Sequence, residues 1–311
     1  MIKDLVDGAN ASGIYLVKDF SKCVTNGGKS YLNLHFQDAS GVIDGKKWEV
    51  SDEDLNSLEV GSLIRIDGQA LDYKGKIQIK VLGIYKVDPH DVDLKDFLVD
   101  SPIAVEILIS KFKKYYNSVK NEDCKAILKE IFTRYYKEFI DYPAAVKNHH
   151  EFYHGLIYHT VSMCEVAEFC GKHYPFLNYD LLISGCLLHD IGKVIELSGP
   201  IATKYTEEGN LLGHLTIGMS IVKEVADRLN IKSEVPTLLE HMILSHHGKL
   251  EFGAAVLPLT PEALILSMID DMDAKMMMLE KALKDVKEGE YSDRLFALDN
   301  RTFYKSKVKN D

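Results

Sequence analysis

The apolar residues of this chain follow one spacing up to about residue 88 and a different one beyond it. From Gly13 to Val87 they lie in short segments rich in β-branched and aromatic residues, separated by turn-forming residues. Beyond Asp88-Pro89-His90 they recur at i, i+3 and i+4, the period of an α-helix. With 311 residues the chain also exceeds the usual size of one domain. We therefore expect a β domain followed by an all-α domain, with the boundary at Asp88-Pro89-His90.

The β part contains five candidate strands, at 13–22, 29–37, 41–50, 62–73 and 76–87, and a short helix is expected at 51–61. Five strands with a helix after the third are the outline of an OB-fold, a small barrel that commonly binds oligonucleotides. The binding residues come from the second and third strands and from the first and fourth loops. The candidates here are Lys29, Tyr31, Phe36, Lys46, Trp48, Tyr73, Lys74 and Lys76.

These candidates have a structural alternative. Bases stack on exposed aromatic rings whatever the base, and lysines follow the phosphate backbone. Aromatic residues of strands can instead fill the barrel interior, and the sequence leaves open which of them do so. The formal net charge of −10 argues against a general nucleic-acid coat, so that binding would depend on local positive patches.

Histidine and aspartate residues recur within the apolar helical segments of the second half of the chain. Residues 94–142 carry helical spacing and are expected to link the two domains, which divides the chain into 1–90, 91–145 and 146–311. A polar group in an apolar segment is costly unless it is paired. Divalent cations prefer imidazole nitrogen together with carboxylate oxygen, so the set predicts a metal site. It comprises His159, His189, Asp190, His214, His246, His247 and Asp270.

The segment CLLHDIGKV places an imidazole next to a carboxylate. On a helix, His189 and Asp190 would point about 100° apart, so that two metal ions between them could share the carboxylate. Asp190 is therefore the predicted bridge. Lys193 follows one turn later, where it would neutralise a phosphate oxygen rather than bind metal.

The order His159, His189-Asp190, His214, His246, Asp270 resembles that of the HD superfamily of metal-dependent phosphohydrolases. Together with the predicted OB-fold and the segments ILSHHGKLEFG and DDMDAK, it resembles the YhaM family of 3′-5′ exoribonucleases over nearly the whole chain. Tyr158 departs from the family pattern, in which we would expect an acidic residue before the first ligand.

The resemblance implies two divalent ions and assigns residues to each. The first ion would be held by His159, His189, Asp190 and Asp270. The second would be held by His214 and His246, with Asp190 shared. His247 is left open as a metal ligand, a phosphate contact or an orienting group, and Asp271 replaces Asp270 if the register shifts by one. The neighbouring histidines are expected at the rim of the site: His149, His150 and His154.

The implied reaction is hydrolysis of phosphodiester bonds in single-stranded RNA from the 3′ end, with single-stranded DNA as a second substrate. Two cations can activate water and hold a phosphodiester, and the predicted catalytic residues are Asp190 and Lys193. The resemblance favours manganese, while iron or another divalent ion also suits histidine and aspartate ligands.

Two other functions stay open. One is an HD phosphohydrolase acting on a small nucleotide or cyclic dinucleotide, against which the oligonucleotide-type barrel argues. The other is a non-catalytic protein that binds single-stranded nucleic acid, against which the unbroken set of buried polar residues argues.

Cellular location and assembly are predicted only broadly. The charged start MIKDLVDGAN and the lack of a long apolar run favour a cytoplasmic protein without a membrane partner. A homo-oligomer is left open, because joined subunits could frame a locally basic channel in an acidic protein.

Overall fold

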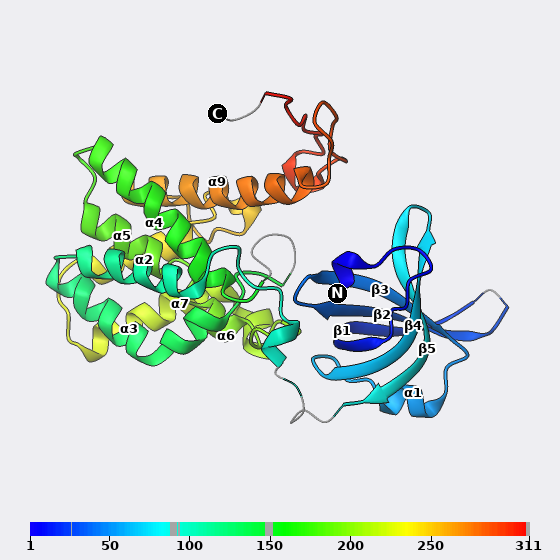
Figure 1. The fold of residues 1–311 in the computed structure, drawn as a ribbon. Helices are drawn as coiled ribbons and strands as arrows, with labels where there is room; N and C mark the ends of the chain where they lie inside the picture. Colours follow the sequence, from blue (N-terminus) through cyan, green and yellow to red (C-terminus); the bar gives the residue numbers. More distant parts are fainter. Residues whose placement is uncertain (26, 88–91, 93, 147–151, 309–311) are drawn as a thin grey trace. The chain divides into compact units, whose positions relative to one another are not determined.

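The computed structural model describes residues 1–25, 27–87, 92, 94–146 and 152–308. The chain forms two compact units (Figure 1). The first comprises Met1–Asp100 with Pro200–Thr203, and the second comprises Ser101–Gly199 with Lys204–Asp311. The predicted boundary Asp88-Pro89-His90 lies outside the described residues, as do His149 and His150. The division into 1–90, 91–145 and 146–311 stays a prediction.

The first unit is a closed five-stranded barrel with the strand order β1-β2-β3-β5-β4. Its strands are β1 (Gly13–Val24), β2 (Ser30–Asp38), β3 (Gly41–Trp48), β4 (Leu63–Tyr73) and β5 (Lys76–Lys86). Neighbouring strands are antiparallel except β3 and β5, which pair in parallel. A register shift in β1 between Val17 and Asp19 helps this long strand bend and pair with both β2 and β4. The predicted OB-fold is confirmed.

Three short helical segments accompany the barrel: η1 (Ile2–Asp4), α1 (Asp52–Asn56) and η2 (Leu94–Phe97). Helix α1 lies between β3 and β4 as predicted, but it is only five residues long. Its first turn is closed by a capping box, in which the Ser51 hydroxyl accepts a hydrogen bond from the Asp54 backbone and the Asp54 carboxylate accepts one from the Ser51 backbone.

The barrel core is built from alternate residues of each strand. On β2, Leu32, Leu34 and Phe36 are fully buried, while Tyr31 and His35 point to the other side of the strand. Phe36 therefore fills the barrel, and the prediction that it contacts nucleic acid is wrong. On the paired strand β3, Gly45 is the register partner of Leu34, and a Cβ added there would lie 2.5 Å from Phe36 Cε2.

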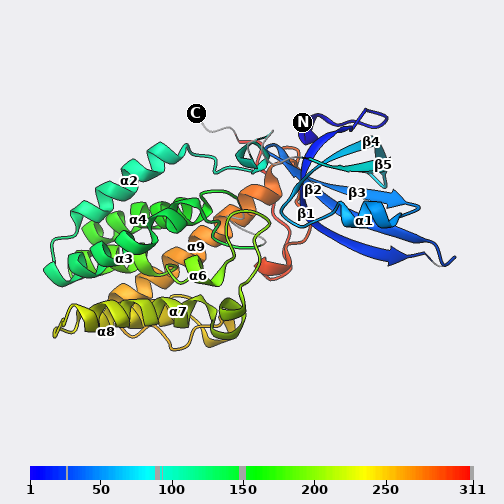
Figure 2. The ribbon, with the colours of Figure 1, turned by 90° about the horizontal axis from the view of Figure 1, so that it is seen from below.

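The second unit is all-helical. Its α-helices are α2 (Val105–Ser118), α3 (Glu122–Asp141), α4 (Gly155–His173), α5 (Tyr179–Leu188), α6 (Lys193–Glu196), α7 (Glu207–Arg228), α8 (Val235–Ser245) and α9 (Pro261–Leu283), with short turns η3 (Leu250–Phe252) and η4 (Phe296–Leu298). Helix α5 is buried from Leu181 to Leu188 and packs against α4, α8 and α9, while α7 and α8 lie side by side (Figure 2). The central helix thus delivers its C-terminal end to the middle of the unit.

The segment after α9 folds back on itself through two isolated bridges, Tyr291 with Tyr304 and Leu295 with Arg301. Lys305 Nζ donates hydrogen bonds to the Leu283 and Lys284 carbonyls, which ties the segment to the end of α9. Among the helices that the structure describes, none is long and apolar enough to cross a lipid bilayer.

The contact between Gly45 and Phe36 gives a test of the barrel core. Gly45→Ala should lower the free energy of unfolding of the barrel by about 1–3 kcal/mol, because the buried Phe36 ring has to shift. Gly27→Ala is the matched control, because the nearest atom to its added Cβ is 3.9 Å away. Urea denaturation followed by Trp48 fluorescence measures both. Equal stability of the two variants would contradict this packing.

Candidate metal and phosphate site

His189 and Asp190 lie just beyond the C-terminal end of α5. The sequence predicted that both residues lie on a helix. In the structure α5 ends at Leu188, and residues 189–192 form the turn that leads into α6. His189 still has helical backbone angles as the C-cap residue. Both side chains are buried, Asp190 with 3% of its surface exposed and His189 with none. The apolar helix before them therefore places both groups in the protein interior.

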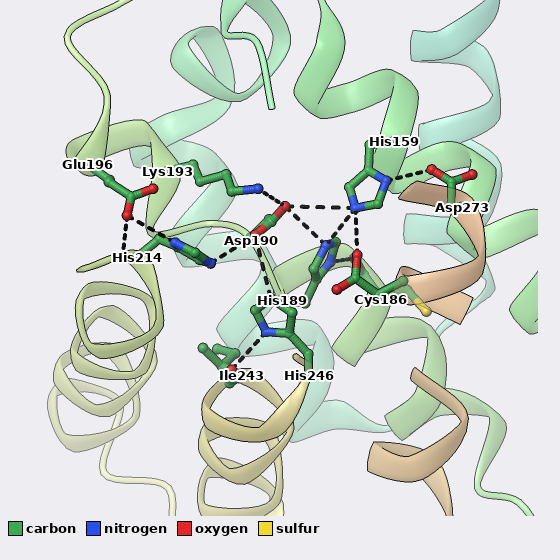
Figure 3. Close-up of polar contacts among 11 residues, drawn as sticks. His159, Cys186, His189, Asp190, Lys193, Glu196, His214, Ile243, His246 and Asp273 are labelled. Carbon is green, nitrogen blue, oxygen red and sulfur yellow. Dashed lines mark hydrogen bonds and ion pairs between the residues drawn. The ribbon is translucent and has the colours of Figure 1, made fainter. Parts of the chain in front are cut away.

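Asp190 presents its two carboxylate oxygens to two different sets of histidines (Figure 3). Its Oδ2 lies 3.3 Å from His189 Nε2 and 3.8 Å from His159 Nε2. Its Oδ1 lies 3.6 Å from His214 Nε2 and 3.7 Å from His246 Nε2. The carboxylate thus lies between the two sets.

Two groups of potential metal ligands result, and in each the ligand atoms lie within 4.8 Å of one another. The first group is His159, His189 and Asp270, and the second is His214, His246 and His247. Asp270 Oδ1 is 3.1 Å from His159 Nε2, while Asp271 is exposed and pairs with Lys275 at 2.5 Å. The structure therefore brings together all the predicted ligands, with Asp270 in the first group and His247 in the second.

Four of these histidines use Nδ1 for a hydrogen bond that fixes the ring. The acceptors are Asp273 for His159, the Cys186 carbonyl for His189, Glu196 for His214 and the Ile243 carbonyl for His246 (Figure 3). Each group thus contains one histidine backed by a carboxylate and one backed by a backbone carbonyl. In all four histidines, Nε2 faces Asp190. Ligand histidines of metalloproteins are likewise oriented by a hydrogen bond at the ring nitrogen that does not bind the metal.

The position of His214 depends on a kink in α7. Gly213 has φ 70° and ψ 154°, which breaks the helix directly before His214. The His214 backbone N–H and ring Nδ1 both donate to Glu196 Oε1 at 3.0 Å. Glu196 thus orients both the backbone and the ring of His214. Sequence reasoning missed Glu196 and the carboxylate role of Asp273, although a buried glutamate in the apolar segment KVIEL was a signal for the first.

Gly192 of the HDIGK segment allows a close backbone approach. A Cβ at Gly192 would lie 2.1 Å from the His214 carbonyl oxygen and 2.8 Å from the Gly218 nitrogen. The turn that carries Asp190 therefore rests on the α7 backbone beside His214. Any side chain at position 192 would push the two halves of the site apart.

The carboxylates of the site are held in their charged form. Burial favours the neutral acid at Asp190, but Lys193, His189 and His214 outweigh it and hold its pKa well below the usual value. The Lys193 Nζ donates to Asp190 Oδ2 at 2.6 Å, and despite burial this carboxylate raises the pKa of Lys193. Hydrogen bonding from His159 likewise keeps the pKa of the partly buried Asp270 low.

The histidines differ in charge state. Burial lowers the pKa of His246 well below its usual value and also lowers that of His247, which leaves both neutral at pH 7. Burial also disfavours charge on His159, but hydrogen bonds to Asp270 and Asp273 raise its pKa to about 10. His246 and His247 are thus ready to donate lone pairs, whereas a metal bound by His159 would have to displace a proton from it.

The donor set fits divalent cations. Among the residues that the structure describes, five buried side-chain atoms have no hydrogen-bond partner, and three of them belong to this site: Asp190 Oδ1, His214 Nε2 and His247 Nδ1. Unsatisfied buried polar atoms are costly, and their gathering at one place is explained if a cation binds there. Imidazole nitrogens together with carboxylate oxygens are ligands that divalent cations accept.

A cavity of about 270 Å³ opens onto these groups. Its polar lining includes Asp190, Lys193, His247 and Asp270. Lys193 therefore faces the same space as the ligands, as its predicted role requires. His154 is buried at the N-cap of α4, and the structure does not show it at this cavity's wall.

A separate patch of aromatic and basic residues lies on the barrel, formed by Tyr31, Lys46, Trp48, Tyr73 and Lys74. The Tyr31 and Trp48 rings stack with their centroids 4.9 Å apart. Lys46 Nζ lies 5.6 Å from the centroid of the Tyr31 ring and 6.0 Å from that of the Tyr73 ring. Lys74 Nζ lies 5.4 Å from the centroid of the Tyr73 ring. Trp48 and Tyr73 are about half exposed. The other two predicted lysines are also exposed: Lys29, directly before β2, and Lys76, the first residue of β5.

Comparison with protein families identifies the class of the helical unit. Residues 156–275 match the family model described as "HD domain". This range begins in α4 before His159 and ends in α9 after Asp273, so it contains both ligand groups. The helical unit therefore contains an HD domain, and the match supports a metal-dependent phosphohydrolase.

Several solved structures are similar to parts of the chain. The HD domain of the Listeria monocytogenes phosphodiesterase PgpH shares 19% identity, with 53% of this chain and 76% of that chain covered and a TM-score of 0.29. An OB domain from Thermoplasma acidophilum shares 18%, with 33% and 90% covered and a TM-score of 0.24. A murine DNA-binding protein, bound to double-stranded DNA, shares 17% with a TM-score of 0.23. The similar region makes up 28% of this chain and 46% of the murine chain, so this chain spans less than half of that protein's length.

The Glu196 contact gives a test of how the second ligand group is held. Glu196→Gln should weaken metal affinity at this group by about 10–100-fold, because His214 loses a charged acceptor. Competition with a fluorescent chelator measures the affinity. Glu207→Gln, an exposed glutamate at the start of α7, is the control and should bind metal as the unchanged protein does. Equal affinities in the two variants would show that Glu196 does not position His214.

Proposed function

We propose that this protein is a metal-dependent 3′-5′ exoribonuclease that hydrolyses single-stranded RNA, with single-stranded DNA as a second substrate. The observation that carries the proposal is the position of Asp190 between two ligand groups, with Lys193 beside it. RNA as the preferred substrate, the 3′-5′ direction and manganese as the metal rest on the resemblance to the YhaM family.

Two divalent ions would be held, one by His159, His189 and Asp270 and the other by the three histidines of the second group. Asp190 would be shared between them. When bound, such a pair of ions supplies Lewis acidity and an activated water for phosphodiester hydrolysis.

The protein's own groups have separate tasks. The low pKa of Asp190 keeps it an anionic ligand across the neutral range. The Lys193 ammonium is mostly buried, charged and open to the cavity, so it can stabilise negative charge that develops on a phosphate oxygen. Asp273 and Glu196 hold the rings of His159 and His214 in place. No nucleophilic side chain is needed.

The barrel supplies affinity for the strand. Stacked and half-exposed rings with lysines beside them suit single-stranded nucleic acid, because each base has a flat face and each phosphate a negative charge. Such contacts tolerate any sequence, which suits an enzyme that removes successive nucleotides.

The activity is tested with 5′-labelled single-stranded RNA and manganese. The unchanged protein should give a ladder of products shortened from the 3′ end, and Asp190→Asn should reduce the rate at least about 100-fold by removing the shared charge. Glu280→Gln, an exposed carboxylate on α9, is the control and should keep the rate. RNA left intact by metal-loaded protein would overturn the proposal and favour a small nucleotide as substrate.

The barrel's task is tested by binding of fluorescent single-stranded RNA in the Asp190→Asn background. Trp48→Ala and Tyr73→Ala should each raise the Kd about tenfold, since one stacked base contributes about 1–3 kcal/mol. Tyr85→Ala is the matched control, because this half-exposed ring lies against Arg65 and bonds to Asp67 away from the patch. If all three variants bind alike, the patch is not the binding surface.

A further inference from the structure

The turn after the paired histidines holds an aromatic ring in the wall of the cavity. Gly248 and Gly253 have positive φ values of 74° and 93°, and between them lies η3. Phe252 N donates to the Lys249 carbonyl at 3.0 Å, and Ala255 N donates to the Leu244 carbonyl of α8 at 2.9 Å. The turn is thus closed internally and tied to the helix that precedes His246.

The ring of Phe252 lines the cavity, yet 57% of the residue's surface is exposed. Lys249 Nζ lies 5.0 Å from the ring centroid and 3.4 Å from Glu251 Oε1. A side chain that served only to fill the core would be buried, as Phe139 is. Phe252 instead presents aromatic surface at the edge of a polar site.

The cavity lining combines charged and apolar groups. The charged groups Asp190 and Lys193 are mostly buried, with 3% and 14% of their side chains exposed, and Asp271 and Lys275 of α9 add an ion pair to the lining. Apolar surface comes from Phe252 of η3, Ala274 and Met278 of α9, and Ala297 of η4. A volume of about 270 Å³ lies just below the usual range for ligand pockets, which suits one small ligand rather than a length of strand.

We propose that Phe252, with Met278 and Ala297, forms a subsite for the base of a single terminal nucleotide whose 5′-phosphate lies at Asp190 and Lys193. A nucleotide combines an anionic phosphate, which suits Lys193, with a flat base that can stack on the exposed ring of Phe252. Stacking on Phe252 accepts every base, because each has a π-face. The ligand class is a nucleoside 5′-monophosphate unit, free or as the 3′ end of a strand. The proposal rests on the proposed function for the phosphate end of the cavity.

The test compares two ligands that differ in the base alone. Adenosine 5′-monophosphate and ribose 5-phosphate are titrated calorimetrically into manganese-loaded protein. The unchanged protein should bind the nucleotide roughly tenfold more tightly, and Phe252→Leu should remove this preference while leaving the affinity for ribose 5-phosphate unchanged. Phe252→Tyr keeps an aromatic face and should restore the preference.

Phe176→Leu is the matched control, because Phe176 is an exposed phenylalanine between α4 and α5 and not part of the cavity lining. It should bind both ligands as the unchanged protein does. The proposal is overturned if the unchanged protein shows no preference for the nucleotide, if Phe252→Leu keeps the preference, or if it weakens both ligands equally.

The outcome separates this proposal from that of the exoribonuclease. If RNA stays intact but the preference for the nucleotide depends on Phe252, the subsite stands and the exoribonuclease proposal fails. If RNA is shortened and Phe252→Leu leaves both KM and the binding preference unchanged, the subsite fails and the exoribonuclease proposal stands.

Discussion

The buried carboxylate of Asp190 is the constraint on which the helical unit depends. An isolated anion with 3% exposure would be strongly unfavourable, and here it is balanced by Lys193 at 2.6 Å and surrounded by four imidazole rings. Each ring is oriented by its own Nδ1 hydrogen bond. The order of the site therefore depends on backbone carbonyls and carboxylates one layer further out, as well as on the ligands.

The surrounding fold is arranged to deliver these groups to one place. The apolar helix α5 brings His189 and Asp190 to the interior, Gly192 lets the following turn rest on the α7 backbone, and the kink at Gly213 sets the direction of His214. The cavity over these groups is also lined by the exposed aromatic ring of Phe252. A charged interior next to an aromatic rim is the reason for proposing a nucleotide unit as the ligand.

Much of the fold could be predicted, because strands and helices leave periodic signals, and the five predicted strands are present. The histidines and aspartates in apolar segments marked the site by composition. Their division into His159, His189 and Asp270 on one side and His214 and His246 on the other was implied by the resemblance to the HD superfamily, and it matches the two geometric groups. The error at Phe36 was avoidable, since the alternation in YLNLHF puts this residue on the face of Leu32 and Leu34.

The pairings behind the ligands could not be read from the sequence. Glu196 stands out as a glutamate in the apolar segment KVIEL, but its pairing with His214 depends on the kink of α7 at Gly213, and a kink without proline leaves little local signal. Asp273 reaches His159 from a helix more than 100 residues further along the chain. Such pairings are set by how the helices pack rather than by spacing along one of them.

The central claim is that Asp190 lies between two bound metal ions, and the most direct measurement is anomalous X-ray diffraction from crystals of the manganese-loaded protein. The account predicts two anomalous peaks, one beside His159, His189 and Asp270 and one beside His214, His246 and His247, with an Asp190 oxygen bound at each. A single peak, or peaks away from Asp190, would contradict it.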